Sequence, residues 1–189
     1  MVVNLEKRML SAEDFWEMPE IPGKRFELVR GELVEMPGTG GVHGVIVGLI
    51  YRLLWGAAQA AGGGYVAPDG VGYIVARALD VVRVPDASFV AHERIPPEGI
   101  PVAHWPFAPD IAVEVCSPGD RAEDLHVKVA EYLAGGSRLV MVVWPRTRSV
   151  TRFEADGTAR ELGPDDVLDA GEVLPTFRVR VADLFADVA

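Results

Sequence analysis

The chain has 189 residues, which is enough for one domain with a substantial buried core. Its 49% hydrophobic and 24% charged residues are typical of a globular protein, and the single cysteine, Cys116, excludes an intrachain disulfide and a multi-cysteine zinc site. The net charge of −10 argues against nucleic-acid binding through a broad basic surface, although a local site or a dimer can still gather basic residues.

Residues 42–61 form the longest apolar segment, and Arg52, Gln59 and several glycines interrupt it. A membrane helix needs about 20 consecutive, predominantly apolar residues, so we predict no membrane span. The N-terminal segment lacks the basic start and apolar centre of a signal peptide. We therefore predict a cytoplasmic protein.

The first predicted element is a short helix over residues 11–18, with Ser11 as its N-cap and Pro19 after its end. Residues 25–36 follow, with apolar and polar residues alternating on both sides of Arg30-Gly31. This alternation around a turn predicts a β-hairpin near the N-terminus.

Residues 42–61 have apolar side chains at the i, i+3, i+4 and i+7 spacing of a helix packed against a large surface. The glycines at 62–64 end this predicted helix. Residues 65–76 and 81–91 are each predicted as a strand, and the proline-rich residues 92–109 as a loop.

The next strand is predicted at residues 111–116, followed by a helix over 121–134 that Asp120 can cap and that Gly135-Gly136 ends. Residues 139–144 are almost wholly apolar, which is typical of a central strand covered on both faces. This order of elements predicts one mixed sheet with helices packed on it.

The C-terminal part adds a hairpin, with strands at 150–155 and 159–162 around the turn at Asp156-Gly157. Residues 174–185 are predicted to form a short strand and a last helical turn. With no internal repeat or linker, we predict a single α/β domain over residues 1–189, with its core at about 10–186.

Two predicted strands each contain an acid within an apolar run: Asp86 in residues 81–90 and Glu114 in residues 111–116. A carboxylate in a buried strand loses its hydration, which costs several kcal/mol unless a partner compensates it. Two such acids can share a hard divalent cation such as Mg²⁺, which prefers oxygen ligands. The alternative for Asp86 is an ordinary acid at a strand edge after Pro85.

Lys128 is one of only three lysines, against fifteen arginines, and the other two lie at residues 7 and 24. A site that needs only positive charge could use arginine, whereas lysine supplies a compact ammonium that can approach a phosphate or a water molecule. The alternative is a simple i, i+4 ion pair with Asp124, which contributes only about 0.3–0.5 kcal/mol.

The chain resembles an uncharacterised restriction-endonuclease-like family of the PD-(D/E)XK nuclease superfamily over about residues 10–186. The resemblance lies in the order and spacing of several segments, none of which is specific alone. These segments are Phe26 to Leu33, His43 at the start of the long helix, the strand with Asp86, Glu114-Val115-Cys116-Ser117-Pro118, the helix with Lys128 and Tyr132, Gly135-Gly136, and Leu174-Pro175. It implies a restriction-endonuclease-like core with a mixed central sheet flanked by helices, an N-terminal hairpin and a C-terminal β extension.

The resemblance also implies roles for single residues. Asp86, Glu114 and the backbone carbonyl of Val115 would hold Mg²⁺ or Mn²⁺, and Lys128 would stabilise charge on the phosphate or orient water. The superfamily pattern has a lysine two residues after the second acid, where this chain has Cys116. Lys128, on the following helix, would replace it.

Glu27 and His43 are secondary candidates. Glu27 is either a third acid near the metal or an ordinary surface acid of the hairpin. His43 is either an anion contact at the start of the long helix or a polar residue of the helix terminus.

The function that these residues predict is Mg²⁺-dependent hydrolysis of phosphodiester bonds, with DNA as the expected substrate. We expect a homodimer, because cleavage of a duplex needs two sites. Two alternatives stay open: a non-catalytic protein of the same fold that binds nucleic acid or protein, and a metal-dependent phosphodiesterase that acts on small molecules.

Overall fold

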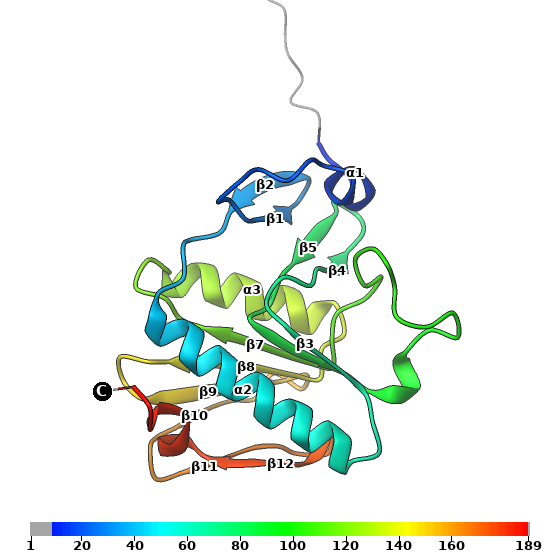
Figure 1. The fold of residues 1–189 in the computed structure, drawn as a ribbon. Coiled ribbons are helices and arrows are strands. Elements are labelled where there is room, and N and C mark those ends of the chain that lie inside the picture. Colours follow the sequence, from blue (N-terminus) through cyan, green and yellow to red (C-terminus); the bar gives the residue numbers. More distant parts are fainter. Residues whose placement is uncertain (1–8, 189) are drawn as a thin grey trace, which may run out of the picture.

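The structure is a computed structural model, and it describes residues 9–188. Figure 1 shows a central sheet crossed by two long helices, with a smaller sheet beside it that carries the N-terminal hairpin. The two helices are α2 (Gly41–Ala60) and α3 (Ala122–Ala134). A mixed sheet flanked by helices confirms the predicted α/β fold class.

The central sheet has six strands, and β8 (Leu139–Trp144) lies in its interior between β7 (Ile111–Val115) and β9 (Ser149–Glu154). Only β7 and β8 run parallel to each other, and all other pairs are antiparallel. Five of the six β8 residues are buried, as its apolar sequence predicts. The remaining strands of this sheet are β3 (Tyr65–Pro68), β6 (Ala87–Val90) and β10 (Ala159–Leu162).

The two long helices cover opposite faces of this sheet. The buried residues of α2 belong to the same apolar cluster as Ile111, Val113 and Val115 of β7. Leu125 and Val129 of α3 instead belong to a second cluster, together with Ala112 and residues of β8. Because side chains alternate along a strand, Glu114 faces α3 together with Ala112.

The second sheet has four strands, and its hairpin of β1 and β2 turns at Arg30 and Gly31, which have φ angles of 52° and 78°. Two successive positive φ values are typical of the tight turn that the sequence predicts here. Ser11 caps the preceding α1 (Ala12–Trp16) through a capping box with Asp14, as expected. The strands are β1 (Phe26–Val29), β2 (Glu32–Glu35), β4 (Tyr73–Ala76) and β5 (Val81–Arg83).

The prediction of one sheet with unbroken strands at 65–76 and 81–91 is wrong. Each of these segments contributes one strand to the central sheet and one to the four-stranded sheet. The first segment breaks at a turn over Asp69 and Gly70, and the second at Pro85, which lacks the N–H that a continuing strand needs. The break at Pro85 places Asp86 immediately before β6.

The C-terminal part forms the predicted hairpin of β9 and β10, where Gly157 has a φ of 87°. A separate two-stranded sheet of β11 (Val167–Ala170) and β12 (Leu174–Arg180) packs beside α2, and β11 was not predicted. Two short 3-10 helices complete the fold: η1 (His92–Arg94) and η2 (Val181–Phe185).

By length and composition α2 could span a membrane, and it is the one helix in residues 9–188 that could. In the fold its buried residues Ile46, Ile50 and Leu54 lie in the main apolar cluster. A long apolar helix that packs on a sheet in this way is also typical of the core of a globular domain.

Candidate active site

Asp86 is fixed where β6 begins beside the end of β7. Its Oδ2 accepts a hydrogen bond of 2.7 Å from the Val115 N–H, and its own N–H donates to the Val113 carbonyl at 3.0 Å. The Nε2 atom of His43, in the first turn of α2, lies 3.2 Å from Oδ1. Each oxygen of this buried carboxylate therefore has a polar partner within the protein.

Glu114 of β7 is the neighbour of Asp86 across the pair of chain segments. Ala87 pairs with Val113 in the antiparallel ladder, so the same register places Asp86 opposite Glu114. Directly opposed residues have Cβ atoms only about 5 Å apart. Both residues are buried, with relative exposures of 6% for Asp86 and 5% for Glu114.

Two groups of α3 hold the Glu114 carboxylate. The Tyr132 hydroxyl donates to Oε1 at 2.8 Å, and the Lys128 ammonium lies 3.1 Å from Oε2. Burial raises the pKa of Glu114 to about 7; Asp86 and Glu27 also raise it, against the opposing effects of Lys128 and Tyr132. Burial lowers the pKa of Lys128, but the neighbouring carboxylates outweigh this effect and raise it overall.

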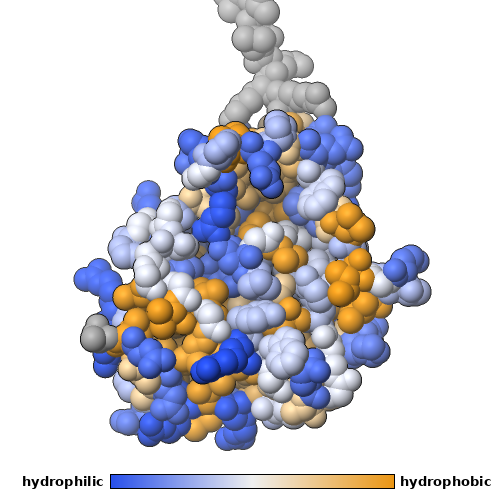
Figure 2. All heavy atoms as spheres, in the orientation of Figure 1, coloured by the Kyte–Doolittle hydropathy of each residue, from blue (hydrophilic) through white to orange (hydrophobic). Residues whose placement is uncertain are grey.

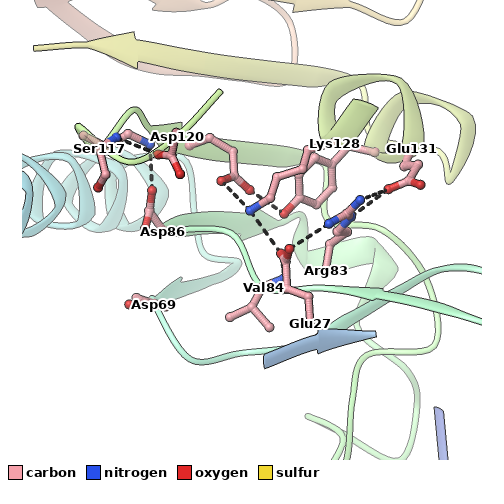
Figure 3. Close-up of polar contacts among 12 residues, drawn as sticks. Glu27, Asp69, Arg83, Val84, Asp86, Ser117, Asp120, Lys128 and Glu131 are labelled. Carbon is pink, nitrogen blue, oxygen red and sulfur yellow. Dashed lines mark hydrogen bonds and ion pairs between the residues drawn. The ribbon is translucent and has the colours of Figure 1, made fainter. Parts of the chain in front are cut away.

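Glu27 of β1 joins this group to a second buried cation. Its Oε1 lies 3.2 Å from the Lys128 Nζ and also accepts the Val84 N–H at 3.0 Å. Its Oε2 accepts a 2.7 Å hydrogen bond from Arg83, which continues to Glu131 of α3 at 2.5 Å. Figure 3 shows Glu27 between Lys128 and Arg83, which makes it a bridge between the two sheets and α3.

The buried network has more negative than positive charge. Glu27, Glu114 and Glu131 pair with Arg83 and Lys128, and Asp86 pairs with His43, which is a cation only when it is protonated. If the four acids are ionised, two negative charges remain without a cation when His43 is neutral, and one when it is protonated. Burial is the main cause of the raised pKa of Glu114, and the charges of Asp86 and Glu27 raise it further.

His43 lies at the junction between this network and a large cavity. The cavity has a volume of about 730 Å³ and lies between the start of α2 and the loops that follow β7 and β8. Burial lowers the pKa of His43, but its contact with Asp86 and the charges of Asp69 and Asp120 outweigh this and raise it overall. His43 therefore faces carboxylates on one side and the cavity on the other.

A comparison with protein families matches residues 12–182 to the model described as "Uma2: Putative restriction endonuclease". The chain belongs to the Uma2 family. Its description supports a nuclease function and a nucleic-acid substrate, and restriction-endonuclease-like nucleases in general use divalent metals. A comparison with curated proteins gives no match.

Among solved structures, the chain is similar to the crystal structure of "a putative nuclease belonging to DUF820" from Anabaena variabilis. The TM-score is 0.82 at 18% identity, and the match covers 93% of this chain and 97% of that one. This similarity supports the restriction-endonuclease-like fold of the Uma2 chain.

The structure brings the residues predicted from the sequence into one place. Lys128 of α3 contacts both Glu114 and Glu27, and Asp86 lies opposite Glu114 in the register of β6 and β7. Lys128 therefore points into the site and not toward Asp124. His43, at the start of α2, contacts Asp86 and also lines the cavity. Their catalytic roles stay predictions.

The sequence analysis missed Arg83 and Glu131, and it named Tyr132 only as part of the family pattern. Arg83 lies in the same apolar run as Asp86, so the argument about buried charge applied to it equally. Asp69, which pairs with Arg25 and keeps its Oδ1 buried without a partner in residues 9–188, was also missed. The prediction that Asp120 caps α3 is wrong, because its carboxylate accepts the Ser117 N–H at 2.6 Å and Arg121 occupies the N-cap position without a side-chain cap hydrogen bond.

The donor set fits a magnesium-type ion. In residues 9–188 no group of three or more His, Cys, Asp and Glu side chains forms a metal cage. Magnesium needs no such cage, since it commonly binds one or two carboxylates and fills its remaining positions with water and phosphate oxygens. Asp86 and Glu114, in a network with more acids than permanent cations, match that requirement.

Proposed function

We propose that this Uma2 protein hydrolyses phosphodiester bonds in DNA with Mg²⁺ or Mn²⁺. The observation that carries the proposal is the buried pair of Asp86 and Glu114 at neighbouring positions of adjacent chain segments, with the Lys128 ammonium 3.1 Å from Glu114. Acids alone would fit a simple salt-bridge network. Their excess of negative charge beside a single lysine favours a site for a cation and a phosphate.

Asp86, Glu114 and the Val115 carbonyl would hold the metal, which supplies a polarised phosphate oxygen and a more acidic water when bound. Lys128 would place its ammonium against the negative charge that develops on the phosphate. Glu27, fixed by Arg83, would keep Lys128 in that position. Tyr132 would hold the Glu114 carboxylate in one orientation.

We also propose that the protein works as a homodimer. Val42, Val45 and Trp55 on the outer face of α2 are each about half exposed. Figure 2 shows apolar patches on the face of the molecule that carries α2, broken by hydrophilic side chains. Light scattering of the purified protein tests this proposal, and a monomeric mass at micromolar concentration contradicts it.

Plasmid nicking in the presence of Mg²⁺ or Mn²⁺ tests the proposed activity. The variants are Asp86→Ala, Glu114→Ala and Lys128→Ala, with Asp156→Ala as the control, because Asp156 is an exposed acid of the β9–β10 turn. We expect wild type and the control to nick DNA and the other three to lose activity. Activity that survives all three substitutions contradicts the site, and cleavage of simple phosphodiesters without affinity for oligonucleotides indicates a small-molecule enzyme.

A further inference from the structure

The cavity beside His43 is not used by the proposed hydrolysis. Its wall is formed by the start of α2, including His43, and by the strand-end loops that carry Cys116, Asp120, Trp144 and Arg146. A volume of about 730 Å³ lies within the range of about 300–1,000 Å³ typical of small-ligand sites. The cavity is therefore large enough for one nucleotide but far too small for a duplex.

The position of the cavity relates it to the DNA strand. His43 lines it and lies 3.2 Å from Asp86, so the cavity is one side chain away from the carboxylate pair. A strand whose scissile phosphate reaches Asp86 and Glu114 must place its neighbouring nucleotide nearby.

The lining of the cavity has the chemistry that a nucleotide needs. Trp144 supplies an aromatic surface, and base stacking on such side chains contributes about 1–3 kcal/mol per base. Arg146 is exposed at the cavity wall and supplies a guanidinium for a phosphate. Asp120 is the one acid among the lining residues, and a carboxylate can accept hydrogen bonds from the amino group of a base.

We propose that this cavity binds a single unpaired nucleotide of the DNA strand, next to the phosphate that is cleaved. The proposal rests on the proposed nuclease function and adds a substrate class to it. A base within a duplex cannot enter unless it leaves the stack, which costs a few kcal/mol, whereas a single strand offers its bases without that cost. The favoured substrates are therefore single strands and segments with unpaired bases.

Protection of Cys116 from alkylation tests the proposal, because this residue lines the cavity and is the only cysteine of the chain. Iodoacetamide is added to the whole protein at alkaline pH without divalent metal, so no hydrolysis occurs. The probes are a 12-nucleotide single strand and a blunt duplex of the same sequence, each at a concentration that saturates binding by fluorescence anisotropy. We expect the single strand to slow alkylation at least fivefold and the duplex less than twofold.

Two variants separate the cavity from general charge effects. Arg146→Gln removes the guanidinium at the cavity and is expected to weaken single-strand binding about tenfold and to reduce the protection. Arg138→Gln makes the same change at an exposed position just before the first residue of β8, at the end opposite to Trp144. It should leave both single-strand binding and the protection of Cys116 unchanged. Trp144→Phe, which keeps an aromatic ring, should retain most of the protection that Trp144→Leu loses.

The proposal is overturned if the saturating single strand leaves Cys116 as reactive as before, or if the duplex protects it equally. An equal loss in Arg138→Gln and Arg146→Gln also overturns it. Plasmid nicking is measured in parallel. Nicking without protection rejects the nucleotide cavity alone, and protection without nicking rejects the proposed hydrolysis alone.

Discussion

Asp86 makes contacts that an amide of the same shape could also make. An asparagine at this position can accept the Val115 N–H with its oxygen and donate its amide hydrogen to His43, so both observed contacts have a replacement. What it cannot supply is negative charge. The buried network around Asp86 contains more acids than permanent cations, so the loss of one negative charge there should stabilise the fold. The same loss should impair the proposed activity, so stability and activity should change in opposite directions.

We therefore expect Asp86→Asn to fold and to be more stable than wild type without metal by about 1 kcal/mol, or about 2–4 °C in Tm for a chain of this size. Its nicking activity should fall about 100-fold or more, because a ligand of the metal is lost. Thermal unfolding with and without Mn²⁺ provides the second measurement. Wild type should be stabilised by Mn²⁺ and the variant should not; an equal Mn²⁺ shift in both proteins would place the metal elsewhere.

Lys128 is proposed to have two separable roles. Its positive charge stabilises the fold, and its compact ammonium group serves the proposed chemistry. Lys128→Met leaves Glu27 and Glu114 without their shared cation, and breaking a buried pair in this way costs about 3–5 kcal/mol. Lys128→Arg keeps the charge but replaces the compact ammonium with a planar fork. We expect Lys128→Arg to retain most of the stability in urea unfolding while losing nicking about 100-fold. Full activity of Lys128→Arg would mean that the residue serves only as a counter-ion.

The element that assembles the site is α3. Lys128, Glu131 and Tyr132 follow the i, i+3 and i+4 spacing, so one face of the helix reaches both Glu114 and Arg83. The helix ends against β4 at Gly135. A Cβ atom added there would lie 2.8 Å from the Val75 carbonyl oxygen and 3.1 Å from the Ala108 Cβ. The position of the lysine thus depends on a close approach at the far end of its helix.

Gly135→Ala should therefore destabilise the protein by about 1–3 kcal/mol, because backbone at the contact must move. Since α3 would shift with it, we also expect a lower nicking rate in the folded fraction. Gly48→Ala is the matched control: the residue lies inside α2 with open space around it, and alanine should stabilise the helix by about 0.5–1 kcal/mol. Urea unfolding measures the free energy of unfolding of both variants. Similar changes in the two variants would contradict the proposed close packing of Gly135.

At the scale of the whole molecule, the local sequence patterns correctly predicted the helices, strands and turns that depend mainly on nearby residues. The periodicity of α2, the apolar run of β8 and the Arg30-Gly31 turn each led to the correct element. The breaks at Asp69 and Pro85 were missed because both flanks continue the same apolar pattern, and only the fold shows that they enter different sheets. For the site, the buried acids and the rare lysine led to Asp86, Glu114 and Lys128, which the structure brings close together and whose roles stay predictions. Their joining through Glu27 and Arg83 depends on how α3 crosses two sheets, which no local pattern contains.

The attachment of α1 to the rest of the molecule should make stability depend on pH. His104 stacks on Phe15 of α1, with ring centroids 5.3 Å apart, and also meets the edge of Trp16. Its Nε2 is buried without a hydrogen-bond partner in residues 9–188. Burial lowers the pKa of His104 below its usual 6.5, and the nearby charge of Glu13 opposes this only partly.

The sign of the effect follows from which state binds the proton first. The unfolded chain protonates His104 near pH 6.5, whereas the folded chain does so only at lower pH, so stability is lost as the pH falls below about 6.5. His104→Phe keeps a ring for Phe15 but cannot ionise. We expect the Tm of wild type to fall relative to this variant between pH 7 and pH 5, with the difference growing toward acid. A constant difference across that range would show that His104 titrates equally in both states and that its burial does not govern the docking of α1.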